Sequence, residues 1–203
     1  MPMGIIIPMS IIISLSLNLK TMELPYRNKI TSAEINPVLI DFYRCNSGSF
    51  KPLGFWYAIN DGWKKFWYDD EKMDIIDNKF IYEILINSRD FTTDLTRKNL
   101  DKILIIKDPQ HLEAFVKKYG AMFDEKYNLI EKSLKKDFDI YSLTDLVKIG
   151  INWKLLESHY AGFELNFYDE RFRPMLWYGA FDCASGSIWK PSKIVKFNLI
   201  TSN

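Results

Sequence analysis

The sequence lacks the motifs by which common enzyme classes are recognised, and it has few residues suited to metal or nucleophile chemistry. It holds only two cysteines and two histidines. The glycine-rich Gly-x-Gly-x-x-Gly loop, the P-loop, the His-Glu-x-x-His zinc motif and the Gly-x-Ser-x-Gly nucleophile motif are all absent. The sequence therefore gives no sign of a Rossmann dehydrogenase, a P-loop nucleotidase, a zinc protease or an α/β-hydrolase.

The scarcity of cysteine also bears on the cellular compartment in which the protein is expected. Cys45 and Cys183 cannot form a disulfide framework, and neither has metal-site spacing with His111 or His159. We therefore expect no metal and a reducing, cytoplasmic setting. The 27 Lys and Arg residues nearly balance the 26 Asp and Glu residues, so no overall field attracts polyanions. The net charge gives no support for a nucleic-acid partner, but it does not exclude one.

What the chain does have is enough apolar sequence for an ordinary core. It has 203 residues, of which 47% are hydrophobic and 15% aromatic, with six tryptophans. These values are typical of a globular domain that is rich in aromatic residues. We expect an apolar N-terminal extension over residues 1–20, one α+β domain over residues 21–203, and a monomer.

Residues 3–19 form an almost uninterrupted apolar run. The run has no basic segment before it and no small-residue cleavage site, which argues against a secretory signal. It is also interrupted by Pro8 and is short for a membrane span, which needs about 20 apolar residues. A β-rich or poorly ordered extension, an upstream-translated artefact and a membrane anchor all stay open.

The residue patterns of the remaining chain indicate strands and helices without regular alternation. A proline- and polar-rich connector is expected over residues 21–36. Strands are expected at 38–44, 53–58, 81–86, 102–106 and 162–164. Helices are expected after Asp61, over 109–119 behind an Asp-Pro start, over 124–136, from Ser142 to Gly150, and after Asn152. This order favours a mixed α+β fold with a mostly antiparallel sheet and flanking helices.

Glu164 is the candidate site acid. It lies between Phe163 and Leu165, so in a strand its carboxylate points away from both apolar neighbours. The alternative is a solvated charge on a half-buried strand. A second candidate set pairs Cys183 with His159, against a buried structural cysteine. A third groups Asp169, Glu170 and Asp182, against a loop of solvated charges.

Two separated blocks carry a resemblance to a known family. They are Lys-Pro-Leu-Gly-Phe-Trp-Tyr at 51–57, and the motifs Tyr-x-Gly-x-Glu and Trp-Tyr-Gly-x-x-x-Cys-Ala-Ser-Gly-x-x-Trp within 160–189. Together they resemble a widespread family of small uncharacterised bacterial and viral proteins with a Lys-Pro-x-Gly-Leu-Trp-x-Ser signature. The resemblance covers roughly residues 38–195. Phe55 and Ala58 stand where the signature has leucine and serine, so the signature hydroxyl is missing here.

The layout of that family is similar in turn to the ADP-ribosyltransferase-like fold. This likeness implies an arginine or a histidine on an early strand, small or aromatic residues that line a nicotinamide slot on a second strand, and a glutamate on a late strand. In this chain it implies Glu164 as the catalytic residue and NAD as the substrate. The residues implied for NAD binding are Arg44, Lys51, Trp56, Tyr57 and Tyr160.

The chemistry explains these residue types. Cleavage between nicotinamide and ribose passes through an oxocarbenium-like state, which a carboxylate on the ribose 2-hydroxyl stabilises. A guanidinium matches a pyrophosphate, and aromatic rings stack on nicotinamide. The expected function is transfer of ADP-ribose to a protein or nucleic-acid acceptor. The alternatives are a non-catalytic, Trp-rich module that binds a nucleotide or peptide, and a hydrolase that uses Cys183 or Ser185.

Overall fold

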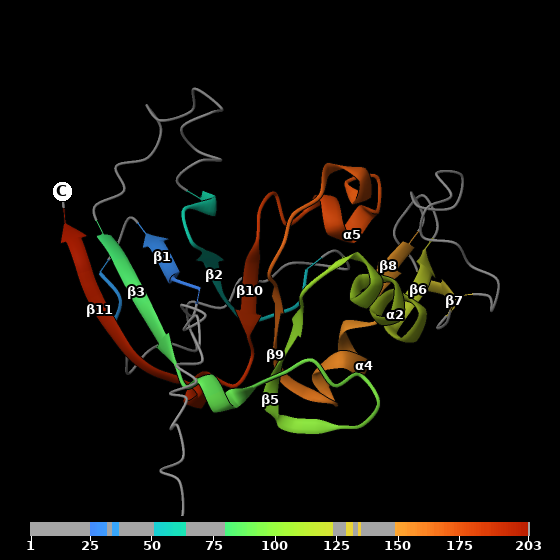
Figure 1. Ribbon diagram of the computed structural model, residues 1–203, viewed down its shortest axis with the longest axis horizontal. Helices are drawn as coiled ribbons and strands as arrows, with labels where there is room; N and C mark the ends of the chain where they lie inside the picture. The colour runs from blue at the N-terminus through green and yellow to red at the C-terminus, as the bar shows by residue number, and fades with distance from the viewer. Residues whose placement is uncertain are drawn as a thin grey trace, which may run out of the picture.

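One curled, mixed sheet dominates the structure, and few helices accompany it. The computed structural model describes residues 25–31, 34–36, 51–63, 80–123, 129–131, 134 and 149–202 (Figure 1). The eight strands follow the order β11 (Ile194–Ser202), β3 (Phe80–Ile86), β1 (Arg27–Thr31), β2 (Phe55–Ile59), β10 (Ser185–Ile188), β9 (Tyr160–Leu165), β5 (Asn99–Ile106) and β4 (Phe91–Thr92). Neighbours from β11 to β9 are antiparallel, whereas β9, β5 and β4 are parallel.

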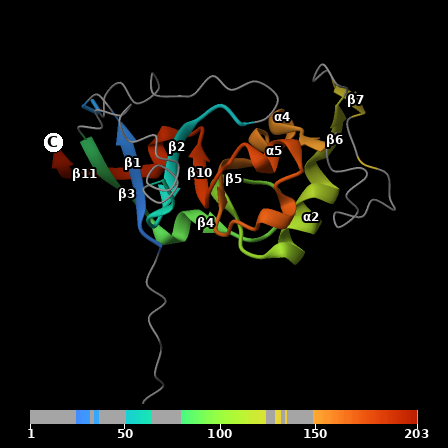
Figure 2. The same ribbon diagram turned by 90° about the horizontal axis from the view of Figure 1, so that it is seen from above.

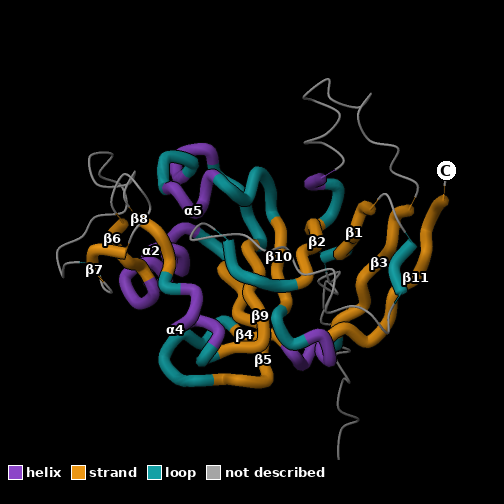
Figure 3. Tube along the Cα trace, turned by 180° about the vertical axis from the view of Figure 1, so that it is seen from behind, coloured by secondary structure: helices purple, strands orange, loops and turns teal. Residues whose placement is uncertain are grey.

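A second, smaller sheet and the helices lie at one end of the main sheet. The small sheet has the order β7 (Leu129–Glu131), β6 (Gly120–Phe123) and β8 (Ile149–Ile151). The α-helices within the described residues are α2 (Pro109–Tyr119), α4 (Trp153–Glu157) and α5 (Leu176–Gly179). Figures 1 and 2 show the three helices gathered beside β5 and β9, while β11, β3 and β1 extend away from them. Seen from behind in Figure 3, the small sheet lies beyond α2, far from β11.

Local sequence signals account for the two best-defined helix starts. The Asp108 side chain accepts a hydrogen bond from the His111 backbone N–H at 2.7 Å, and Pro109 opens α2. The Asn152 side chain caps α4 in the same way, accepting from the Leu155 N–H at 3.1 Å. The predictions of α2 and of the start of α4 are therefore confirmed, whereas Tyr160, which was expected on the second of these helices, opens strand β9.

The main sheet has a different core on each face. Helices α2, α4 and α5 pack on a large aromatic cluster that includes Phe115, Phe163 and Trp177. The opposite face carries a smaller cluster that includes Phe55, Tyr57 and Ile188. These are called the helix-side cluster and the open-side cluster below. Residues alternate between the two because successive strand side chains point to opposite faces.

The expected mixed α+β architecture is confirmed, and several expected elements differ. Strands were expected at 53–58, 81–86, 102–106 and 162–164, and β2, β3, β5 and β9 lie there. Two expectations were wrong: residues 129–131 form strand β7 rather than helix, and Gly150 lies inside strand β8. The expected connector over 21–36 contains strand β1. Residues 1–20, the strand expected at 38–44 and the part of the first helix beyond 63 lie outside the described residues.

Candidate functional site

Glu164 lies at the centre of the main sheet. It sits on β9, opposite Gly186 of β10 on one side and Ile105 of β5 on the other. Its neighbours Phe163 and Leu165 belong to the helix-side cluster, so the Glu164 side chain points to the open side, as predicted. Glu164 is 0% exposed. The alternative of a solvated surface charge is therefore wrong.

Arg27 is the countercharge of Glu164. Its Nε lies 2.6 Å from Oε2 and its Nη2 lies 2.9 Å from Oε1, in a bidentate ion pair. The third nitrogen, Nη1, donates to the Pro25 carbonyl at 3.1 Å, and the guanidinium lies 4.3 Å from the centre of the Phe91 ring. Arg27 is only 5% exposed. The pair is therefore a buried ion pair that joins β1 to β9 across two intervening strands.

Tyr57 completes the cluster from β2. Its hydroxyl donates to Glu164 Oε2 at 2.7 Å. Tyr57, Gly186 and Glu164 are aligned in one row across three neighbouring strands. A Cβ at position 186 would collide with the Tyr57 ring. Glycine at this position therefore allows the Tyr57 ring to pass over β10 and reach the carboxylate. We call Arg27, Tyr57 and Glu164 the charged triad.

The charges of the triad stabilise one another. Burial lowers the pKa of Arg27, but the hydrogen bond and the negative charge of Glu164 outweigh that effect, so the pKa is raised overall. Burial and then the charge of Glu164 raise the pKa of Tyr57 well above its ordinary value. Arg27 therefore stays cationic and the Tyr57 hydroxyl stays protonated, so both remain hydrogen-bond donors.

The two oxygens of the Glu164 carboxylate accept different numbers of hydrogen bonds. Oε2 accepts from both Arg27 and Tyr57, whereas among the described residues Oε1 accepts only from Arg27. A carboxylate offers about four acceptor positions, two on each oxygen. Oε1 therefore keeps an acceptor position that no described residue uses, and this position lies in the interior because Glu164 is 0% exposed.

Trp56 and Lys51 lie on the other face from Glu164. Trp56 belongs to the helix-side cluster and packs edge-on against Phe181, with ring centres 5.0 Å apart. The Lys51 ammonium lies 5.1 Å from the centre of the Trp56 ring. Since Tyr57 follows Trp56 directly in β2, the two rings point to opposite faces. They cannot stack on the same nicotinamide.

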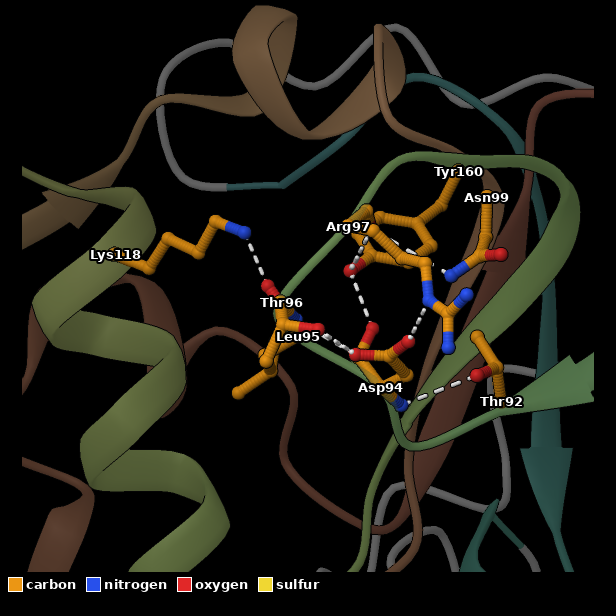
Figure 4. Close-up of polar contacts among 8 residues, drawn as sticks. All are labelled: Thr92, Asp94, Leu95, Thr96, Arg97, Asn99, Lys118 and Tyr160. Atoms are coloured by element: carbon orange, nitrogen blue, oxygen red, sulfur yellow. Dashed lines mark hydrogen bonds and ion pairs between the residues drawn. The ribbon is translucent and has the colours of Figure 1, made fainter.

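Tyr160 is also remote from the triad. Its hydroxyl donates to the Asp94 carbonyl at 2.8 Å, and its ring packs against Tyr119 and His159 in the helix-side cluster. Figure 4 shows Tyr160 directed at the loop that contains Asp94 and Arg97. Arg44 lies outside the described residues. Of the residues implied by the resemblance, the structure therefore brings together Tyr57 and Glu164.

Arg27 is the residue that the sequence reasoning missed. It stands in the polar stretch that was expected to be a connector. The segment Arg-Asn-Lys-Ile-Thr does not alternate between apolar and polar residues over its length, and it has few β-branched residues, so its pattern does not indicate a strand. The only signal there was an arginine near the start of a domain whose implied fold has an arginine on an early strand.

The other candidate constellations have simpler explanations in the structure. Cys183 is buried, and burial together with Asp182 raises the pKa of its thiol to about 12, so it is no activated nucleophile. Asp169 forms an ion pair with Arg171 at 2.5 Å, and its pKa is lowered by that hydrogen bond. No group of three or more potential metal-ligating side chains occurs among the described residues.

Comparisons with protein-family models, with curated proteins and with solved structures found no match to this chain. Within the described ranges, no helix is long and apolar enough to cross a membrane. The charged triad is therefore the feature of the described structure that bears most directly on function.

Proposed function

We propose that the chain is an NAD-dependent, ADP-ribosyltransferase-like enzyme whose catalytic carboxylate is Glu164. One observation carries this proposal: an arginine from an early strand, an aromatic residue from a second strand and a glutamate from a late strand meet on one face of the sheet. The resemblance implies that set of residue types in that strand order. In this proposal Arg27 has the early-strand role that the resemblance implied for Arg44.

The reaction needs a carboxylate whose position is fixed before charge develops. The bond from the nicotinamide nitrogen to ribose C1 breaks, its electron pair leaves with nicotinamide, and the ribose becomes oxocarbenium-like. The ribose 2-hydroxyl donates to the open position on Glu164 Oε1. This interaction strengthens as positive charge builds on the ring, so it stabilises the transition state more than the ground state. A nucleophile of the acceptor then bonds to C1 and loses its proton.

Arg27 and Tyr57 act on the carboxylate rather than on the reacting bond. Three donor hydrogens hold the two oxygens of Glu164, so the carboxylate cannot rotate away from the ribose. Preorganisation of this kind is the main way in which a fixed charge lowers a barrier. Both are therefore positioning residues in this proposal.

A second, non-catalytic function is favoured by a specific observation. Glu164 has no exposed surface, and the bidentate pair with Arg27 already satisfies its charge. In that case the charged triad joins strands and has no ligand. Trp56, Trp153 and Trp177 would not line the expected groove, because each is at most 7% exposed.

The two functions are separated by NAD binding and turnover. NAD at 100 times its dissociation constant stabilises a binding protein by about 2.7 kcal/mol, which thermal unfolding detects. We expect such a shift with the full chain, together with release of nicotinamide and transfer of labelled ADP-ribose to cell extract. Absence of both the shift and nicotinamide release at millimolar NAD would favour the binding module.

A further inference from the structure

A half-buried histidine at the start of β9 is held in a defined orientation. His159 Nδ1 lies 2.8 Å from the Tyr119 hydroxyl of α2 in a hydrogen bond. The His159 carbonyl accepts from the Asn99 N–H at 2.8 Å, which ties the same residue to β5. With Nδ1 engaged, Nε2 is the ring nitrogen left for a ligand.

Two lysines on different elements stand next in the chain to residues that bond His159. Lys98 directly precedes Asn99, and Lys118 directly precedes Tyr119, so each is the chain neighbour of a residue bonded to His159. Lys118 donates to the Leu95 carbonyl and lies 5.4 Å from the centre of the Tyr119 ring (Figure 4). Burial first, and then the charges of Lys98 and Lys118, lower the pKa of His159. The imidazole is therefore neutral near pH 7, and the charges of both lysines act on it.

The surrounding charges leave the cluster basic. The nearest acid across Tyr160 is Asp94, which is paired with Arg97 at 2.7 Å in the same loop (Figure 4). Helix α4 contributes an exposed Lys154 and a partnered Glu157 just before His159. Cations thus outnumber unpaired acids around the ring, and a dianion would relieve their mutual repulsion.

We propose that His159, Lys98 and Lys118 form a binding site for the phosphate group of a small ligand, separate from the charged triad. A phosphate monoester is mostly dianionic at neutral pH and accepts hydrogen bonds from several donors at once. Its charge offsets both lysines and favours uptake of a proton by His159, whose Nε2–H then donates to a phosphate oxygen. The site is about 17 Å from Glu164 along β9, a separation of five residues at about 3.3 Å per residue.

The test uses nuclear magnetic resonance to titrate the two histidines of the full-length protein, with pyrophosphate as the probe. We expect saturating pyrophosphate to raise the pKa of His159 by about 1, the effect of an opposite charge in contact. His111 is the internal control, because it lies on the first turn of α2, and its pKa should not move. Sodium chloride at equal ionic strength should also leave His159 nearly unchanged.

A matched variant, Lys98→Gln/Lys118→Gln, tests the two cations. Without ligand, the pKa of His159 should be higher than in wild type, because two repelling charges are gone, and pyrophosphate should raise it little further. An equal pyrophosphate effect in wild type and variant would overturn the proposal. So would no effect in wild type, or an effect from a single-stranded oligonucleotide alone, which would indicate a nucleic-acid surface instead. None of these outcomes depends on Glu164.

Discussion

Strand β9 presents two kinds of core on its two faces. On the helix side, the Phe163 ring lies 5.0 Å from Phe115 and 5.8 Å from Phe181, centre to centre, in a packed aromatic cluster. On the open side, Glu164 is equally buried but depends on one cation and one hydroxyl. The first face is stabilised by shape and apolar area, and the second by matched charges. The two faces should therefore respond differently to substitution.

The largest effect should come from removing one member of the ion pair. Arg27→Met leaves the Glu164 charge buried without a partner, so the free energy of unfolding should fall by about 3–5 kcal/mol. Glu164→Leu should lower the free energy of unfolding by about the same amount, because it leaves the Arg27 charge buried without a partner. The double variant Arg27→Met/Glu164→Leu should recover most of that loss, because no uncompensated charge remains. Urea unfolding measures all three.

Phe163→Ala is the matched variant on the helix side. It should also cost about 3–5 kcal/mol, because it removes a buried ring and leaves a cavity. Loss of a second aromatic neighbour, as in Phe163→Ala/Phe115→Ala, should give no recovery. If the two losses at Arg27 and Glu164 simply add, the difference between the faces does not exist.

A smaller effect is expected from the hydroxyl of Tyr57. Tyr57→Phe removes a hydrogen bond to a charged group, which should cost about 1.5–3 kcal/mol. The control is Tyr178→Phe on the helix side, where the hydroxyl accepts from the neutral Asp169 N–H at 2.9 Å. That loss should be about 1 kcal/mol. Equal losses in thermal or urea unfolding would mean that Tyr57 gains nothing from the charge of Glu164.

The smallest effect is expected where an ion pair is exposed. Lys117 Nζ lies 2.6 Å from Glu113 Oε1 on the surface of α2, with side chains 48% and 32% exposed. Glu113→Gln should lower the free energy of unfolding by no more than about 0.5 kcal/mol, because water and side-chain entropy offset most of the attraction. The loss should shrink in 1 M salt. A loss as large as that of Arg27→Met would show that burial is not what distinguishes the triad.

Sequence patterns predicted the elements whose signals are local. Asp108 and Pro109 marked the start of α2, and the apolar run at 103–106 marked strand β5. The direction of Glu164 also followed from its two apolar neighbours, because side chains alternate in any strand. These predictions did not depend on which strands and helices pack together in the fold.

The pairing of Glu164 with Arg27 could not be predicted in this way. The two residues are 137 positions apart, and they meet only because β1 inserts beside β2 in the sheet order. The strand signal of β1 is weak, since its side chains gain their burial from β2 and β3 rather than from their own pattern. The helix predicted from the charge-rich segment 124–136 was wrong for the same reason. Strand β7 forms there by pairing with β6, and the pattern of the segment itself does not show this pairing.

The enzymatic role of Glu164 is tested most directly by Glu164→Gln, which keeps the shape of the side chain and removes its charge. Nicotinamide release from NAD should be compared with wild type at an equal folded fraction, with Glu170→Gln, whose side chain is 70% exposed, as the control. We predict that Glu164→Gln lowers turnover by about 100-fold or more while NAD binding persists. The Glu170→Gln control should match wild type. Equal turnover by wild type and folded Glu164→Gln would contradict a catalytic role for the buried carboxylate.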